Sequence, residues 1–192
     1  MIFVPDSARL RFRLMNGANA RDKQLWWELD QDPEVMRFLN HCKPTPWEEI
    51  DSFFVPRVAE FTNPAAGHGL WEIADKTTGE YLGWILVRYY RFDRPDREPD
   101  NIEFGWRLKR AWWGQGITTE AARAIMQVLQ RNPAIRVFSA LAHPANHASI
   151  GVMKKLGMRF VDERFHIVPG RPPYPAAYYE MPSPNFSSAL SA

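Results

Sequence analysis

The stretch Trp113-Gly114-Gln115-Gly116-Ile117-Thr118-Thr119-Glu120 lies between an apolar, strand-like run and a helix-like run. Glycine adopts positive φ and has no Cβ, so successive backbone N–H groups around the two glycines can converge on one anion. The helix that follows adds the partial positive charge of its N-terminus. The pattern predicts a strand-to-helix turn that holds a phosphate-bearing ligand. Taken alone, it is also compatible with a plain tight turn.

The composition of the chain fits one folded domain with a sizeable core. The chain has 192 residues, of which 45% are hydrophobic and 14% aromatic, and this content suffices for a substantial core. We expect one domain over residues 8–181 and a disordered, Ser-rich tail over 182–192. The 24 basic and 22 acidic residues are spread through the chain and leave a formal charge of +2. Without a basic field, nucleic-acid binding is not expected.

The sequence also argues against disulfides, metals and membrane spans. Cys42 is the single cysteine, which excludes an internal disulfide and fits a reducing compartment. His143 and His147 are four residues apart, but Pro144 and a predicted strand-to-helix change separate them, so they should not share a helical face as zinc ligands do. Charged residues interrupt every longer apolar stretch, and no signal peptide is visible. We therefore expect a cytoplasmic protein that binds no metal and enters no membrane.

Hydrophobic periodicity predicts strands and helices that alternate along the chain. Apolar residues at every second position predict strands, and apolar residues at helical spacing predict helices. The predicted strands cover 10–14, 70–74, 81–89, 102–108, 135–142, 159–167 and 176–181. The predicted helices cover 20–30, 33–39, a segment that begins with a Thr45 and Glu48 capping box, 120–130 and 146–157. Strands and helices on a mixed sheet indicate an α/β or α+β fold.

Several motifs in order along the chain resemble a known family. An Asp-Pro-Glu-Val-Met-Arg helix start at 32–37 comes first, and the Gly-x-Gly turn follows Gly105-Trp106-Arg107-Leu108. His143-Pro144-x-Asn146-x-x-Ser149 and Leu156-Gly157-Met158 come after it. Over roughly residues 8–181, this order resembles the GNAT acyl-CoA N-acetyltransferases, and within them the RimJ/RimL-like branch of ribosomal-protein N-terminal acetyltransferases.

The resemblance implies an α+β fold, an α/β/α sandwich, whose mixed and mostly antiparallel central sheet is splayed around acetyl-CoA. The cosubstrate would lie between the strands at 102–108 and 135–142. The resemblance places the pantetheine arm beside the backbone of Leu108 and within reach of Asn146, whose alternative role is a helix N-cap. Backbone amides would bind the pyrophosphate from Gln115, Gly116, Ile117, Thr118 and Thr119. Thr118 departs from the family, which usually has Gly or Ala there.

The implied chemistry is direct attack of a primary amine on the acetyl thioester, which needs a base for the amine and an acid for the thiol. Glu103 is the candidate base, acting directly or through a water, and its alternative role is a salt-bridged strand carboxylate. Many family members use a tyrosine as the acid, but this chain has Met153 at that position. Ser149 is the nearest hydroxyl that could donate to the sulfur, although such serines more often bond only backbone.

The sequence is compatible with two functions. The first is an acetyl-CoA-dependent N-acetyltransferase that acts on an amine acceptor, either a protein N-terminus or a small molecule. The second is a non-catalytic acyl-CoA-binding sensor or interaction module, which Met153 motivates. Loops carry specificity without a readable code, so the sequence leaves the acceptor undefined, with the pocket expected near Trp47, 91–100 and 169–175. The chain could be a monomer or a homodimer.

Overall fold

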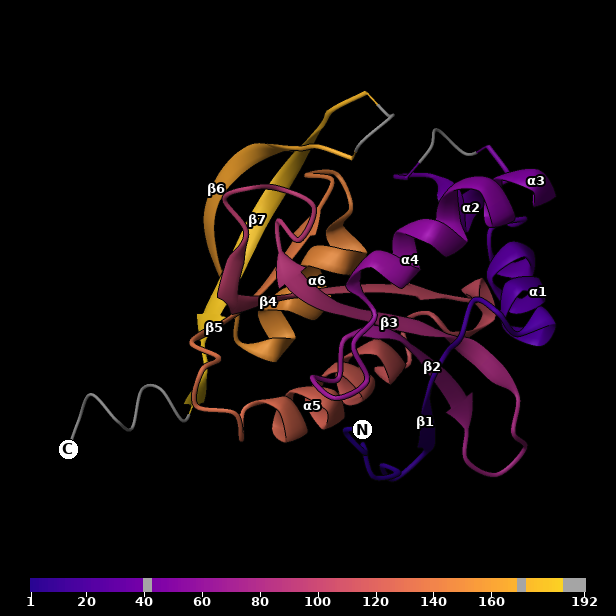
Figure 1. Cartoon of the computed structure of the whole chain (residues 1–192), viewed down its shortest axis with the longest axis horizontal. Helices are drawn as coiled ribbons and strands as arrows, with labels where there is room; N and C mark the ends of the chain where they lie inside the picture. Colours follow the sequence, from indigo (N-terminus) through magenta and orange to yellow (C-terminus); the bar gives the residue numbers. More distant parts are fainter. Residues whose placement is uncertain (40–42, 169–171, 185–192) are drawn as a thin grey trace.

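The computed structural model describes residues 1–39, 43–168 and 172–184, and Figure 1 shows how their elements are arranged. These residues form one seven-stranded sheet in the order β1-β2-β3-β4-β5-β7-β6. Neighbouring strands are antiparallel except β4 and β5, which are parallel. The strands are β1 (Leu10–Leu14), β2 (Gly69–Asp75), β3 (Tyr81–Tyr90), β4 (Glu98–Leu108), β5 (Val137–Ala142), β6 (Arg159–His166) and β7 (Tyr174–Pro182). The predicted mixed, mostly antiparallel sheet is confirmed.

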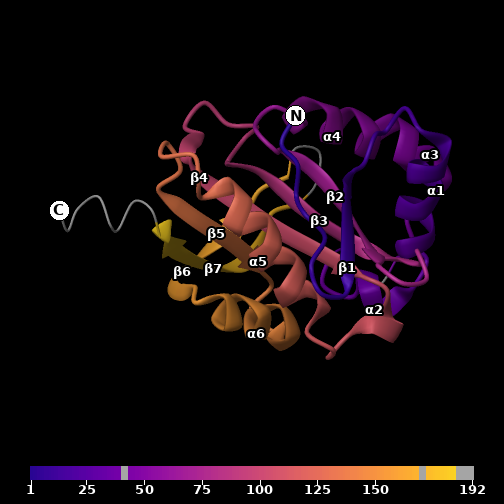
Figure 2. The same cartoon turned by 90° about the horizontal axis from the view of Figure 1, so that it is seen from below.

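Helices pack on both faces of this sheet, as Figures 1 and 2 show. The helices are α1 (Ala20–Leu29), α2 (Pro33–Met36), α3 (Trp47–Glu49), the π-helix η1 (Ile50–Phe54), α4 (Val55–Phe61), the 3₁₀-helix η2 (Arg110–Trp112), α5 (Ile117–Leu129) and α6 (His147–Leu156). A large core joins α5 and α6 to one face, where Ala121 and Ala122 are fully buried and let α5 approach the strands closely. A smaller core around Trp26 and Trp84 joins α1, α2 and α4 to the other face.

The predicted capping box at the third helical segment is wrong. Pro46 occupies the N-cap of α3 and makes no side-chain capping bond. The Thr45 hydroxyl instead donates to Oδ2 of Asp30 at 2.7 Å, and both residues are buried. A buried carboxylate needs hydrogen-bond donors, and the Thr45 hydroxyl supplies one to Asp30. This hydroxyl therefore does not cap α3.

The sheet opens between β4 and β5. The parallel ladder runs from Asn101↔Val137 to Phe104↔Ala140 and stops there, while β4 stays paired with β3 as far as Leu108. Beyond Ala140, β5 continues along β7. β4 follows its antiparallel neighbour β3, and β5 follows its antiparallel neighbour β7, so β4 and β5 diverge. The last four residues of β4 are therefore paired on one side only. We call this opening the split.

The predicted C-terminal tail coincides only partly with the described residues. Pro182 ends β7, and the amide of the buried Ser183 donates to the carbonyl of Arg136 at 2.7 Å. Residues 185–192 lie outside the described part of the chain, and so do Cys42 and residues 169–171, which begin the predicted loop at 169–175.

A buried histidine makes the stability of the fold depend on pH. His68 is 3% exposed and lies edge-on to Tyr89, with ring centroids 4.4 Å apart. Burial lowers its pKa below the ordinary value of 6.5, because the charged imidazolium is the form that desolvation penalises. As the pH falls, His68 therefore binds a proton at a higher pH in the unfolded chain than in the folded chain.

We expect the free energy of unfolding to fall as the pH is lowered from about 7 to about 5. In this range the unfolded state holds more protons than the folded state at His68, so acid favours unfolding. Replacing His68 with Leu removes that proton and should make the decrease smaller in urea titrations at several pH values. The exposed His147, replaced with Gln, is the control. An unchanged pH slope in His68→Leu would contradict the assignment.

Candidate functional site

The glycine turn follows the end of β4 and opens directly into α5. Gly114 and Gly116 have left-handed φ values of 73° and 77°, which glycine adopts without steric cost. Gly116 is the N-cap of α5, and no side chain caps this helix. The N–H groups of its first turn, those of Ile117, Thr118 and Thr119, are therefore presented for an external acceptor. A Cβ on Gly114 would meet no protein atom within 4 Å, and one on Gly116 would meet only Arg9, at 3.8 Å.

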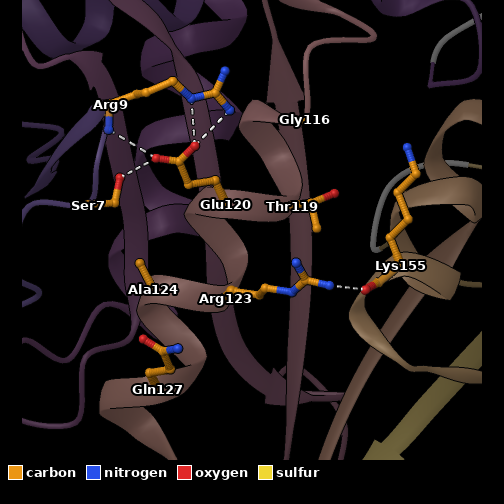
Figure 3. Close-up of a pocket in the computed structure, with 9 residues that line it drawn as sticks. All are labelled: Ser7, Arg9, Gly116, Thr119, Glu120, Arg123, Ala124, Gln127 and Lys155. Atoms are coloured by element: carbon orange, nitrogen blue, oxygen red, sulfur yellow. Dashed lines mark hydrogen bonds and ion pairs between the residues drawn. The ribbon is translucent and has the colours of Figure 1, made fainter.

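An ion-pair network fixes the turn from the side of the N-terminal segment (Figure 3). The guanidinium of Arg9 donates to the carbonyl of Gln115 through both terminal nitrogens, each at 3.2 Å, and its Nε donates to Glu120 at 2.8 Å. The hydroxyl of Ser7 donates to the other carboxylate oxygen at 2.7 Å. Burial acts to raise the pKa of Glu120, but the bonds from Ser7 and Arg9 outweigh it and lower the pKa. The carbonyl of Gln115 is thus engaged by Arg9, whereas no side chain caps the amides at the start of α5.

A cavity of about 580 Å³ adjoins the turn. It lies between the N-terminal segment, α5 and the end of α6, and its wall includes Gly116 and Thr119. Three of its side chains are cationic, those of Arg9, Arg123 and Lys155, and Glu120 is the acidic one. Arg123 also donates to the carbonyl of Lys155 and so ties α5 to α6. The cavity can therefore hold further anionic groups of a ligand whose phosphate sits on the turn.

Trp106 and Ser149 bridge the two sides of the split on the face that α5 and α6 cover. The indole Nε1 of Trp106, on β4, donates to Oγ of Ser149, on α6, at 3.0 Å. The Ser149 amide donates to Oδ1 of Asn146 at 3.1 Å, so the proposed N-cap role of Asn146 is present. Since the Ser149 hydroxyl accepts from the indole, its own proton can point elsewhere.

Leu108 and Met153 also border this region. The carbonyl of Leu108 accepts a hydrogen bond from the Trp113 indole at 2.9 Å, so one of its two lone pairs is engaged. Met153, at the position where many relatives have a tyrosine, is fully buried in the large core. Its side chain therefore belongs to the packing of α6.

Glu103 faces the opposite side of the sheet. It lies directly across from Arg88 on β3, which donates to its two carboxylate oxygens at 3.0 and 2.8 Å. Both side chains are less than 10% exposed. The salt bridge that was the alternative role of Glu103 is thus present, and the role of this carboxylate as a base stays a prediction.

The structure brings the sequence-predicted residues together in two groups around the split. One group lies on the side of the sheet that α5 and α6 cover, and it consists of the turn residues 115–119, Leu108, Asn146 and Ser149. Glu103 lies on the opposite side of the sheet. Sequence reasoning missed the residues that support them, because each comes from a distant part of the chain: Ser7, Arg9, Arg88, Arg123 and Lys155. For Arg88 a signal existed, since it is a charged residue within the apolar run of β3.

Two further expectations concern metals and membranes. Among the residues that the structure describes, no group of three or more His, Cys, Asp or Glu side chains could hold a metal ion. In the same residues, no helix is long and apolar enough to cross a membrane.

The mixed sheet, its split and the glycine turn agree with the fold that the family resemblance implies. Residues 9–159 match the acetyltransferase (GNAT) domain family, and the chain belongs to it. It is 30% identical over 159 residues to the uncharacterized protein YkkB of Bacillus subtilis (strain 168), covering 79% of this chain and 83% of YkkB. It is 26% identical over 153 residues to the FsC-acetyl coenzyme A-N(2)-transacetylase of Aspergillus fumigatus, covering 79% of this chain and 64% of that protein.

The fold is also that of RimL, a ribosomal L7/L12 alpha-N-protein acetyltransferase solved in complex with coenzyme A. The two structures superpose with a TM-score of 0.70, covering 93% of this chain and 97% of RimL, at 17% sequence identity. At this identity the likeness shows the fold alone. The RimJ/RimL branch therefore stays a prediction.

Proposed function

We propose that residues 8–181 act as a single domain that transfers an acetyl group from acetyl-CoA to a primary amine by direct attack in a ternary complex. The observation that carries the proposal is the uncapped start of α5, which borders a cavity lined by Arg9, Arg123 and Lys155. An uncapped helix N-terminus binds phosphate through orphan N–H groups and the helix dipole. A ligand with several phosphates and a long amide-bearing arm fits this arrangement.

The donor would be held along the α5 and α6 face. The amides at 115–119 would bind the pyrophosphate, and Arg123 and Lys155 would meet the remaining phosphate. The arm would enter the split and pair with the free side of β4 near Leu108, as an added strand does. Asn146 would hydrogen-bond the arm with the amide nitrogen that its capping role leaves available.

Glu103 and Ser149 would act on opposite sides of the thioester. An alkyl ammonium has a pKa near ~10.4 and must lose a proton before its nitrogen attacks the carbonyl carbon. Glu103 would accept that proton, directly or through a water. As the carbon–sulfur bond breaks, the Ser149 hydroxyl would donate to the leaving thiolate. Trp106 supports this role because its bond holds Oγ at the split.

Replacing Ser149 with Ala should lower kcat about tenfold, the effect of one lost hydrogen bond to a developing charge. The affinity for acetyl-CoA should change little, because the backbone amides remain. Thiol release at saturating acceptor measures kcat. Ser52→Ala is the control, since its hydroxyl donates to the Glu48 carbonyl far from the split. An unchanged kcat in Ser149→Ala would remove the assigned role.

The second candidate function is an acyl-CoA-binding sensor or interaction module. It is favoured by Met153, which has no transferable proton and is buried in the core. Tight acetyl-CoA binding without thiol release for any amine or peptide would establish it.

We propose a RimJ/RimL-like enzyme in the cytoplasm, consistent with its single cysteine, that works as a monomer or homodimer. Its acceptor is a protein N-terminus or a small-molecule amine.

A further inference from the structure

A second cavity lies on the Glu103 side of the split. It measures about 70 Å³, a volume that holds about two water molecules or the amine end of an acceptor. Glu103, Leu141 and His166 are in its wall. Leu141 is the first residue of β5 beyond the last β4–β5 pair, Phe104↔Ala140. The cavity therefore lies at the point where β4 and β5 separate.

The charged groups of this wall are paired with one another or with neighbours. Asp93 pairs with Arg57 at 3.0 Å, and Glu103 accepts two hydrogen bonds from Arg88. The remaining arginines of the wall each contact a nearby carboxylate: Arg91, Arg94 and Arg164. A guanidinium group also has no lone pair with which to take up a proton. Every arginine and carboxylate that the structure describes in this wall is thus already in an ion pair.

His166, on β6, differs from these groups because its imidazole is not engaged in an ion pair. Its ring lies 5.1 Å from that of Tyr174, its partner on β7, with the two planes at 54°. Within the described part of the chain, this ring contact is made without a hydrogen bond to either ring nitrogen. One nitrogen of a neutral imidazole can accept a proton. His166 therefore offers the cavity a proton acceptor that the ion pairs do not.

Burial keeps this imidazole neutral near pH 7. It lowers the pKa of His166 below the ordinary value of 6.5, because desolvation penalises the charged form. The charges of Glu103 and Asp93 act to raise this pKa, and those of Arg88 and Arg57 act to lower it. Other titratable groups line the cavity or lie against the ring as well: Tyr90, Arg91, Arg94, Arg164 and Tyr174. Since the charge of Glu103 acts on His166, the two side chains are close in space.

Amide formation removes two protons from the acceptor nitrogen. A primary ammonium loses one proton before its nitrogen attacks, and the positively charged nitrogen of the tetrahedral adduct loses the other. Glu103 would take the first proton. One carboxylate holds one proton at a time, and both oxygens of Glu103 already accept from Arg88. The second proton therefore needs another acceptor beside the split.

We infer that His166 is this second proton acceptor, and that it takes the proton of the tetrahedral adduct directly or through a water in the cavity. The inference rests on the proposed function and adds a base to it. As the N–H bond breaks, its electron pair stays on nitrogen and forms the amide, while the carbon–sulfur bond breaks and the thiolate leaves. Glu103 and His166 then release their protons to solvent and the thiolate takes one up, so one proton is released for each amide formed.

The ratio of the wild-type kcat to that of His166→Gln, measured across pH, tests the inference. Thiol release and acetylated amine are followed at saturating acetyl-CoA, with β-alanine, spermidine and an unblocked tripeptide as acceptors. At about pH 7.5 the variant should be slower by about tenfold or more, because glutamine accepts no proton. Below pH 6.5 the ratio should shrink toward one, since the wild-type imidazole is then itself protonated. A merely structural role would give the same ratio at every pH.

Glu163→Gln is the control, because Glu163 is exposed on the same strand and lies outside the wall; its kcat should equal that of the wild type at every pH. His166→Ala gives a second readout, since added imidazole can enter the space that the side chain leaves and should raise kcat in this variant but not in Glu103→Gln. A wild-type kcat in His166→Gln, or a ratio that does not change with pH, would overturn the inference and leave the transferase in place. Absence of transfer by the wild-type protein to any acceptor would instead refute the transferase, and the inference with it.

Discussion

Gly116→Ala should lose at least about tenfold in affinity for acetyl-CoA, or 1.4 kcal/mol, while the protein stays folded. The added Cβ meets no protein backbone, and its nearest atom is the Arg9 guanidinium at 3.8 Å. We expect this methyl group to obstruct a phosphate that approaches the α5 amides. Alanine at a φ of 77° is strained by about 1–2 kcal/mol, so some loss of stability accompanies the change.

Gly79→Ala is the matched control for this substitution. Gly79 has a φ of 74°, and a Cβ there also meets nothing within 4 Å, but the residue lies in the β2–β3 hairpin loop. Both variants should lose similar stability in urea titrations, whereas calorimetry should find weaker acetyl-CoA binding in Gly116→Ala alone. Equal affinities in the two variants would show that the turn does not hold the donor.

Glu103→Gln should lower kcat by roughly 100-fold or more, which is the effect expected for loss of a general base. Affinity for acetyl-CoA should be retained, because Glu103 lies on the other face of the sheet. The variant leaves Arg88 buried without its charged partner, so stability should fall by about 3 kcal/mol, and rates must be expressed per folded, CoA-binding molecule.

Arg88→Gln separates catalysis from the ion pair. It breaks the same two hydrogen bonds as Glu103→Gln but keeps the carboxylate. If Glu103 is the base, Arg88→Gln retains much more of kcat at saturating acceptor than Glu103→Gln does. Equal losses of kcat in both variants would mean that Glu103 serves the ion pair alone.

Local pattern predicted most of the elements because each buries a periodic apolar face. The turn and the Asn146 cap follow from short-range spacing, whereas the split was expected only from the family resemblance. The sequence predicts that this helix starts at Glu120, but α5 begins at Ile117, because two threonines obscure the apolar pattern of its first turn. β4 begins at Glu98, inside what was predicted to be a charged loop, and η1 is a π-helix that periodicity does not indicate.

The surroundings of the site could not be predicted in the same way. Arg9 and Gln115 are 106 residues apart in sequence, and the cavity beside them joins the N-terminal segment to α5 and α6. A smaller cavity beside Glu103 likewise depends on Arg57 of α4, Arg94 of the loop after β3 and Arg164 of β6. Such contacts arise from tertiary packing, and no local pattern encodes them.

The most direct test of transfer at this site is mass spectrometry of an acceptor amine incubated with acetyl-CoA and the protein, with β-alanine as one acceptor. We expect one acetylated amine for each CoA thiol released by the wild-type protein and by Gly79→Ala, and far less product with Gly116→Ala at limiting acetyl-CoA. Thiol release without acetylated amine for any acceptor, or equal product from the two glycine variants, would contradict the assignment of the turn as the donor site of an N-acetyltransferase.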